Sequence, residues 1–526
     1  MAFLNHLGKP ISHEELFAYT NGHFLVNEQW QLGRRYIKFN VDALCEIAAA
    51  AGGDLSRITT VEKLEGGFSK ALLMKKANGK EIIAKLASRI AGPTSLTTAS
   101  EVGILEYVRK HTSIPVPRVF AWSSDNSNPV GAEYIIMEKA AGVPLFEQWG
   151  KMAEIEKLGL IRSLTKLESQ LATIHFPAYG GLYRGTDAKH LRCQVLDENI
   201  DPSRLFCIGP SCDRFFGTEH PQNVELDQGP WSTLSGYGIS IARRELSRIL
   251  SRPSNSGPAS TKGNIEEQVR LLEITMNLMR IMDSHPILAQ FAQPTLWHTD
   301  LHMGNIFVAP DDNTITSLID FQSISILPLF LQAQWPIFLK PPQNYVKGLV
   351  QPKLPDNFSE LDNDDKAVAL RAWTQSKLAK GYEVATILEN KRAHNAMDTV
   401  PRVFRETFIR CGEISEVGPV PLRECLIEIH RNWSSLGFTG ECPYSFSTNE
   451  INAHEREFTE YQAWSEAQQL ALECLDTDAE GWIAPQLDIA EKRRQNRELL
   501  AMYIERMAEE RSASEASAMW PFPDDQ

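Results

Sequence analysis

Apolar residues recur every three or four positions along several stretches of this chain. The longest series lies within residues 153–175, at Ile155, Leu158, Ile161, Leu164, Leu167 and Leu171. Residues 97–111 repeat the pattern more briefly, and residues 265–282 carry a further series. Because this spacing places the apolar side chains on one face of an α-helix, we predict helices over all three stretches.

Shorter segments with strand character surround the helix predicted at 97–111. Residues 80–86 alternate around Ile83 and Lys85, and Asn78-Gly79 just before them is a strong hairpin-turn pair. The predicted strands cover residues 58–64, 71–76, 80–86, 119–122 and 133–138. The expected order is therefore three strands, one helix and two strands.

The remaining segments suggest how the chain is divided. Ser12 and Glu15 fit a capping box and Asn40 fits an N-cap, so the N-terminal part is expected to be helical. Residues 180–262 are rich in Gly, Pro, Cys and aromatic residues and are expected to be an irregular insertion. The predicted divisions are 1–55 (helical), 56–140 (mainly β), 141–340 (with the insertion), 341–508 (helical) and 509–526 (disordered tail).

Composition and charge narrow the class of protein. The 526 residues are 43% apolar, and 67 acidic against 53 basic residues give a net charge of −14. This balance argues against nucleic acid or an anionic membrane as the main partner. Residues 319–339, the most apolar long stretch, contain Asp320 and two prolines, so no membrane span is predicted. The eight cysteines are scattered without zinc-ligand spacing.

The run from His298 to Val308 carries the strongest chemical signal. Asp300 precedes Asn305 by five residues, and Asp320 follows a second apolar strand. Phosphoryl transfer from a nucleotide needs a carboxylate that orients or deprotonates the attacking hydroxyl, and oxygen ligands that hold Mg²⁺ on the phosphates. Asp300 is the candidate base, Asn305 and Asp320 are the candidate metal ligands, and His298 is expected to fix the loop.

Two upstream features fit the same chemistry. Lys85 lies inside an apolar strand, where an ammonium group needs a partner, and Glu101 in the next helix is the natural one, with Glu106 as the alternative. Gly66 and Gly67, followed by Ser69, form a turn whose backbone N–H groups could approach phosphate oxygens. A plain hairpin turn is an equally good interpretation of these glycines.

A metal hydrolase is the competing interpretation of the His298 run. His298, Asp300 and His302 alternate, so an extended segment would place all three on one face, as in a zinc site. That interpretation leaves Asn305, Asp320 and Lys85 without a role, and we consider it the weaker one.

The motif His298-x-Asp-Leu-His-x-Gly-Asn305-Ile, followed by Ile319-Asp-Phe321, resembles that of the aminoglycoside phosphotransferase and choline kinase-like family. Ala99-Ser-Glu-Val102, the Pro115-Val-Pro-Arg118 segment and the stretch 128–138 further resemble the fungal branch named for Altered inheritance of mitochondria protein 9. The resemblance implies a bilobal α+β fold of the protein-kinase type, with a small mainly-β N-lobe and a large α-helical C-lobe that continues into a helical C-terminal extension.

The resemblance also implies roles for individual residues. Lys85 would bind phosphate and Glu101 would orient it, Asp300 would be the catalytic aspartate, and the backbone of Met137, Glu138 and Ala140 would meet adenine. The expected function is an ATP- and Mg²⁺-dependent kinase of a small hydroxyl acceptor, which the acidic chain suggests is cationic. The alternative is a nucleotide-binding protein without turnover that serves mitochondrial maintenance.

The expected location is the mitochondrion by resemblance, with the cytoplasm as the alternative because the N-terminus lacks a clear presequence. The sequence does not define the oligomeric state or the acceptor.

Overall fold

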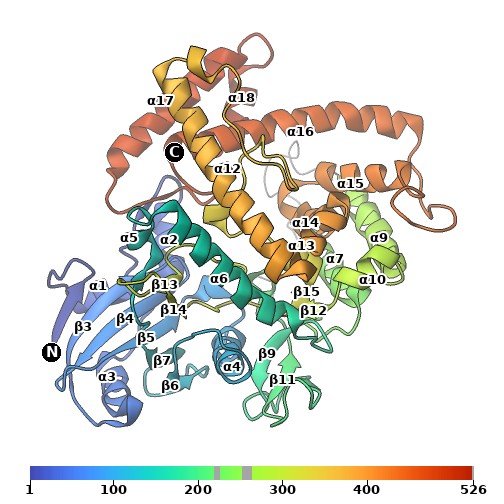
Figure 1. Ribbon diagram of the computed structural model, residues 1–526. Helices are drawn as coiled ribbons and strands as arrows, with labels where there is room; N and C mark the ends of the chain where they lie inside the picture. The colour runs from blue at the N-terminus through green and yellow to red at the C-terminus, as the bar shows by residue number, and fades with distance from the viewer. Residues whose placement is uncertain (218–225, 252–263, 524–526) are drawn as a thin grey trace.

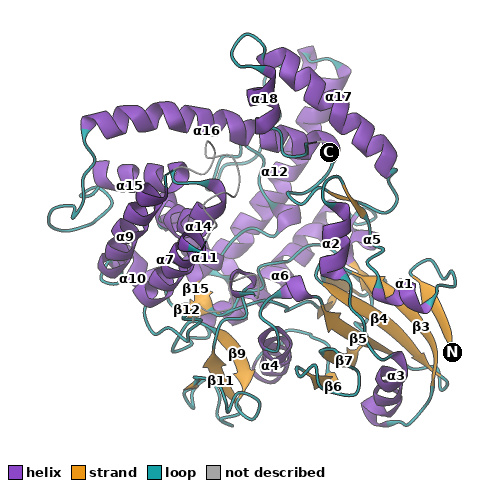
Figure 2. Cartoon of the chain, turned by 180° about the vertical axis from the view of Figure 1, so that it is seen from behind, coloured by secondary structure: helices purple, strands orange, loops and turns teal. Residues whose placement is uncertain are grey.

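The structure is a computed structural model that describes residues 1–217, 226–251 and 264–523. The chain forms two lobes, a small one built around a single β-sheet and a larger one made mainly of helices (Figure 1, Figure 2). The predicted bilobal α+β fold with a helical C-terminal extension is confirmed in this outline.

A six-stranded sheet organises the small lobe. Its strand order is β1-β3-β4-β5-β7-β6, and β1 runs parallel to β3. Side chains of a strand point alternately to the two faces. Ile82 and Ala84 of β5 therefore join a core with Leu44 of α3, while Ile83 packs against the core that includes the next helix, α4. The bounds are β1 (Ala2–Asn5), β3 (Ile58–Glu65), β4 (Ser69–Lys76), β5 (Glu81–Ala87), β6 (Val119–Ser123), β7 (Tyr134–Glu138), α3 (Val41–Ala50) and α4 (Leu96–His111).

Two turns set the register of the first hairpins. Between β4 and β5, Gly79 adopts a φ of 86°, which favours glycine, and the Lys76 N–H donates to the Lys80 carbonyl at 2.8 Å. The predicted Asn78-Gly79 hairpin is thus confirmed. Between β3 and β4, the Gly66 N–H donates to the Ser69 carbonyl at 3.1 Å, so both predicted glycines lie in a tight loop at the end of the sheet.

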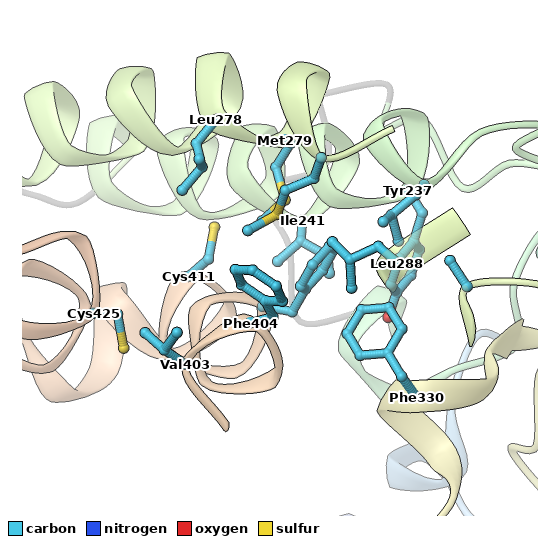
Figure 3. Packing of buried hydrophobic residues seen from close by; sticks show 14 of the residues in the cluster. Tyr237, Ile241, Leu278, Met279, Leu288, Phe330, Val403, Phe404, Cys411 and Cys425 are labelled. Carbon is cyan, nitrogen blue, oxygen red and sulfur yellow. The ribbon is translucent and has the colours of Figure 1, made fainter. Parts of the chain in front are cut away.

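The large lobe is a helical assembly around one extensive apolar core. Tyr237 and Ile241 of α7, Met279 of α9, Phe330 of α11 and Phe404 of α14 meet in this core (Figure 3). The helices are α5 (Leu145–Trp149), α6 (Glu154–Thr173), α7 (Leu234–Leu250), α9 (Ile265–Met282), α10 (Pro286–Phe291), α11 (Leu329–Gln332), α12 (Asn363–Glu389), α13 (Lys391–Thr399), α14 (Arg402–Val417) and α15 (Val420–Arg431). The helices predicted at 153–175 and 265–282 correspond to α6 and α9.

Short strands hold the chemical motif on the side of the large lobe that faces the sheet. β13 pairs with β14 and with β8, so the last residues of the His298 run are held between two antiparallel neighbours. The short strands are β8 (Val143–Pro144), β9 (Gly181–Arg184), β10 (Gln194–Val195), β11 (Phe206–Gly209), β12 (Pro294–Thr295), β13 (Ile306–Val308), β14 (Ile315–Leu318) and β15 (Leu327–Pro328).

The C-terminal extension returns to the N-terminal segment. Strand β16 pairs with β2, and Leu25 shares a buried cluster with Trp520 and Phe522. We call this contact the terminal clasp: residues 13–35 against residues 476–523. Its elements are α1 (His13–Phe17), β2 (His23–Phe24), α2 (Glu28–Arg35), β16 (Trp482–Ile483), α17 (Ile489–Met507) and α18 (Ala513–Met519), and α16 (Thr448–Leu475) leads into it.

Three expectations about local structure were wrong. Residues 1–55 are not purely helical, because β1 extends the sheet beside β3. The described part of 180–262 contains β9–β11 and helix α7, while the rest of that prediction lies outside the described residues. The tail predicted at 509–526 contains α18, because Ser512 and Glu515 form a capping box and the following Trp520 is buried.

Candidate active site

Lys85, Glu101 and Asp320 meet between the two lobes. The Lys85 ammonium donates to Glu101 Oε1 at 2.6 Å and to Asp320 Oδ1 at 2.7 Å. The three groups come from strand β5, helix α4 and the residues after β14. Glu106, the alternative partner, instead lies 3.3 Å from Arg184. The structure therefore brings together a cation and two carboxylates that are far apart in the sequence.

Their surroundings determine how these groups ionise. Burial lowers the pKa of the Lys85 ammonium, but the charges of Asp320 and Glu101 outweigh it and raise this pKa. Burial raises the pKa of Glu101, partly offset by Lys85. For Asp320, burial is outweighed by the charge and hydrogen bond of Lys85, which lower its pKa. Lys85 and Asp320 thus remain charged at neutral pH.

The His298 run forms a loop held by its own side chains. The Asp300 N–H donates to His298 Nδ1 at 3.3 Å, so His298 carries its proton on Nε2, which lies 2.9 Å from the Ile319 carbonyl oxygen. Asn305 donates its amide to the Asp300 carbonyl at 2.9 Å. Burial lowers the pKa of His298, so this ring is neutral and positions the loop. The loop leaves the Asp300 side chain exposed.

Asn305 and Asp320 fit a hard divalent cation. The Asn305 nitrogen is used by the loop, which leaves its oxygen as the ligand atom. Asp320 has a φ of 67°, an uncommon conformation for a residue with a side chain, and the next residue, Phe321, is buried. Carboxylate and amide oxygens, completed by phosphate oxygens and water, are the usual ligands of Mg²⁺.

A cavity of about 750 Å³ lies over these groups. Its lining joins charged residues to apolar ones, including Ile83, Leu105, Phe307 and Ile319. The predicted site residues in the lining are Gly66, Ser69, Lys85, Glu101, Met137, Glu138, Ala140, Asn305 and Asp320. His298, Asp300 and Gly67 are not in the lining; the Gly67 carbonyl accepts from Arg35 Nε at 3.1 Å.

Sequence reasoning missed two basic residues of this region. Arg35, from α2, holds the glycine loop from outside and is paired with Glu480 of the terminal clasp. Arg214 lies with its guanidinium carbon 3.4 Å from the centroid of the Phe68 ring. Asp300 and Asp320 are close enough for their charges to affect the pKa of Arg214. Neither arginine belongs to a sequence pattern, because each acts through contacts across the fold.

A second, smaller cavity of about 250 Å³ lies beside the His298 run. Thr299, the neighbour of Asp300 in the chain, forms part of its wall, together with Phe215 and Phe216 of the insertion and Phe408 of α14. Its charged lining residues are Asp213, Arg244 and Glu413. The pocket is thus mainly apolar, with an aromatic part, and it borders the residue that precedes the candidate base.

The geometry disfavours the zinc interpretation. His298 contacts backbone atoms through both ring nitrogens, and His302 Nδ1 accepts from the Gly304 N–H at 3.0 Å. Within residues 1–217, 226–251 and 264–523, no three His, Cys, Asp or Glu side chains gather as a metal-binding group. No helix within those ranges is both long and apolar enough to cross a membrane.

Known proteins resemble this chain along most of its length. The Subtelomeric hrmA-associated cluster protein of Aspergillus fumigatus is 30% identical over 88% of this chain and 96% of its own length. Altered inheritance of mitochondria protein 9, mitochondrial, of Yarrowia lipolytica is 22% identical over 91% and 86%. The chain therefore belongs to the same family as the Aspergillus protein, and the predicted resemblance to the mitochondrial inheritance proteins is confirmed.

Among solved structures, a ternary complex of aminoglycoside phosphotransferase APH(4)-Ia with AMP-PNP and hygromycin B matches 72% of this chain and 98% of its own. The identity is 15% and the TM-score 0.32. The sequence matches no protein-family profile.

Proposed function

We propose that this protein is an ATP- and Mg²⁺-dependent phosphotransferase that acts on a hydroxyl group of a small molecule. The observation that carries the proposal is the meeting of Lys85, Glu101 and Asp320 within hydrogen-bonding distance at a cavity of about 750 Å³. A phosphate-binding lysine fixed by a helix glutamate, opposite a metal-binding aspartate, is the arrangement used for phosphoryl transfer.

In this proposal the adenine ring lies against the backbone of Met137 to Ala140 and the phosphates extend toward Lys85. Asn305 and Asp320 hold Mg²⁺, which would neutralise phosphate charge when bound. Asp300 accepts the proton of the acceptor hydroxyl. The acceptor oxygen forms a bond to the γ-phosphorus while the bond from that phosphorus to the β–γ bridging oxygen breaks, and ADP leaves with that oxygen.

The acceptor is proposed to occupy the smaller cavity, because this cavity opens beside Asp300 and is distinct from the nucleotide cavity. Its aromatic wall favours a molecule with an apolar portion, and a volume of about 250 Å³ limits that portion to a small group. Asp213, Glu413 and Arg244 are its charged groups, and the net charge of −14 of the whole chain favours a cationic over an anionic acceptor.

A metabolite screen with purified full-length protein tests this function. Wild-type protein with Mg-ATP and a fungal metabolite extract should yield a compound that gains one phosphoryl group. Asp300→Ala should abolish this product and retain Mg-ATP binding. Asp311→Ala, a change at an exposed aspartate in the turn after β13, should leave the product unchanged.

Mg-ATP binding without any Asp300-dependent product would contradict turnover and support the alternative, a nucleotide-binding protein. We also propose a mitochondrial location, supported by the names of relatives such as the mitochondrial inheritance protein of Yarrowia lipolytica. Imaging of a fluorescent fusion beside a mitochondrial marker tests it, and a diffuse cytoplasmic signal would contradict it.

A further inference from the structure

Arg214 belongs to a segment of the insertion that packs against the residues after Asp320. It begins a short 3₁₀ helix, Arg214–Phe216, which is capped by Asp213 through a hydrogen bond from the Phe215 N–H at 3.0 Å. Just before this helix, the buried Cys212 thiol lies 3.0 Å from the Ile324 carbonyl oxygen, four residues after Asp320. These contacts fix the backbone of Arg214 relative to the candidate metal ligand.

The side chain of Arg214 reaches from the large lobe to the tip of the glycine loop in the small lobe. Its guanidinium stacks on Phe68, the residue that follows the two glycines. The Phe68 carbonyl is itself held by the Ser88 N–H at 2.9 Å and the Ser88 hydroxyl at 2.8 Å. Arg214 therefore connects the insertion to the glycine loop, and the backbone is fixed at both ends of this contact.

The donors of this guanidinium are not consumed by protein acceptors. Among the residues that the structure describes, the Arg214 guanidinium has no hydrogen bond or ion pair within contact distance, although Asp300 and Asp320 lie near enough for their charges to act on it. A guanidinium offers five N–H donors in a planar fork that matches phosphate oxygens. Because the guanidinium lies against the glycine loop and near Asp300 and Asp320, those donors are available to an anion bound there.

The charges of the cleft would oppose the entry of a phosphate group unless a second cation lies nearby. Glu101, Asp300 and Asp320 supply three carboxylates, whereas Lys85 supplies one ammonium group, which is already bound to two of them. The terminal phosphate of a nucleotide would enter next to Asp300, where repulsion by the carboxylates is greatest. A second cation at that end offsets this repulsion.

We propose that Arg214 is a catalytic arginine that binds the γ-phosphate of the nucleotide and, through Phe68, holds the glycine loop over it. This inference rests on the proposed function. In phosphoryl transfer the γ-phosphoryl group spreads charge over three equatorial oxygens, and an arginine directed at them stabilises that charge. The residue is supplied by the insertion, so this contact comes from outside the motifs that define the nucleotide site.

Nucleotide preference tests the proposal without a known acceptor. Calorimetry with full-length protein measures the Kd of Mg-ATP and of Mg-ADP for wild type, Arg214→Met, Arg214→Lys and Arg204→Met. Arg204 lies in the same insertion and pairs with Glu198 on the surface, so it serves as the control. Because Arg214 is exposed, its variants should keep the melting temperature of wild type.

We expect Arg214→Met to weaken Mg-ATP binding by about tenfold or more and to leave Mg-ADP binding within about twofold, since the lost hydrogen bonds to a charged group involve the γ-phosphate alone. Arg214→Lys should retain part of the affinity, and Arg204→Met all of it. Equal losses for both nucleotides, or none, would overturn the role of Arg214 alone. A wild-type protein that binds neither nucleotide would overturn the proposed function and this inference with it.

Discussion

At the scale of single residues, burial and the presence of a neighbouring cation together decide which acidic groups of this protein are charged. Asp320 is kept ionised by the Lys85 ammonium. Glu168, buried on α6, is paired with no cation in the described part of the chain, and its Oε2 accepts from the Tyr382 hydroxyl at 3.0 Å. Burial therefore raises the pKa of Glu168 to about 8, and the carboxyl is protonated at neutral pH in the folded protein.

This difference predicts a pH dependence of stability. In the unfolded chain the pKa of Glu168 returns to about 4.5, so between about pH 5 and pH 8 the unfolded state has lost a proton that the folded state keeps. The free energy of unfolding should then fall with rising pH, by at most about 1.4 kcal/mol per pH unit from this residue. Glu168→Gln should remove that contribution. Chemical denaturation of both proteins across this window measures it, and equal slopes would contradict it.

The chemical role of a residue could be predicted from the sequence where its spacing from other residues, or its place in an apolar strand, is typical of that role. Lys85 inside an apolar strand and the Asp300 to Asn305 interval pointed to one region of the structure, where Lys85 and Asn305 line the same cavity and the Asp300 carbonyl accepts from Asn305. Arg214 was not predictable, because its importance arises from the packing of a patternless segment against Phe68. Local sequence cannot record a contact between residues that are more than a hundred positions apart.

At the scale of elements, the glycine loop between β3 and β4 is held by helix α2. Arg35 donates to the Gly67 carbonyl at 3.1 Å and pairs with Glu480, while Asn21 donates to the Glu65 carbonyl at 2.6 Å. These contacts come from the N-terminal segment, which lies before the sheet in the sequence. The loop is thus restrained from outside as well as by its own turn.

Removal of this restraint should loosen the loop. We expect Arg35→Met to increase amide hydrogen exchange at residues 66–69 by about tenfold, because one hydrogen bond to the loop is lost together with the charge that orients it. Exchange in β5 should change little. Arg506→Met, an exposed change on α17, serves as the control. Unchanged exchange at 66–69 in Arg35→Met would show that the turn alone holds the loop.

Elements were predictable where one local rule dominates. The Asn78-Gly79 turn fixes its hairpin, and the apolar period fixes α6. Strand β1 was missed because four residues at a chain end acquire strand structure only through pairing with β3. Helix α18 was missed because a Ser- and Ala-rich composition masks the capping box at Ser512.

At the scale of the whole molecule, the terminal clasp joins the two ends of the chain. Trp520 is 4% exposed, donates its indole N–H to Asn496 Oδ1 at 2.8 Å, and packs in the cluster that contains Leu25. The extension of the large lobe therefore continues, through Glu480 and Arg35, to the glycine loop at the cavity of about 750 Å³. A change that destabilises the terminal clasp should therefore also make the glycine loop less ordered.

Truncation of the buried indole tests the clasp. We expect Trp520→Ala to lower the free energy of unfolding by about 3 kcal/mol, the usual cost of a large buried side chain. Trp30→Ala should cost less than about 1 kcal/mol, because Trp30 is 55% exposed and its contact is a stack with Arg34. Denaturant titration compares the two variants, and equal costs would show that the last residues contribute nothing to the fold.

The central claim is that a magnesium nucleotide binds between Lys85 of the small lobe and Asn305 and Asp320 of the large lobe. Calorimetric titration of ATP with and without Mg²⁺ tests it most directly, on wild type, Asp320→Asn and the exposed control Asp312→Asn. We predict that Mg²⁺ strengthens ATP binding to wild type and to the control by about tenfold or more, and that Asp320→Asn loses this gain. Binding that Mg²⁺ does not strengthen, or a gain that survives in Asp320→Asn, would contradict the account.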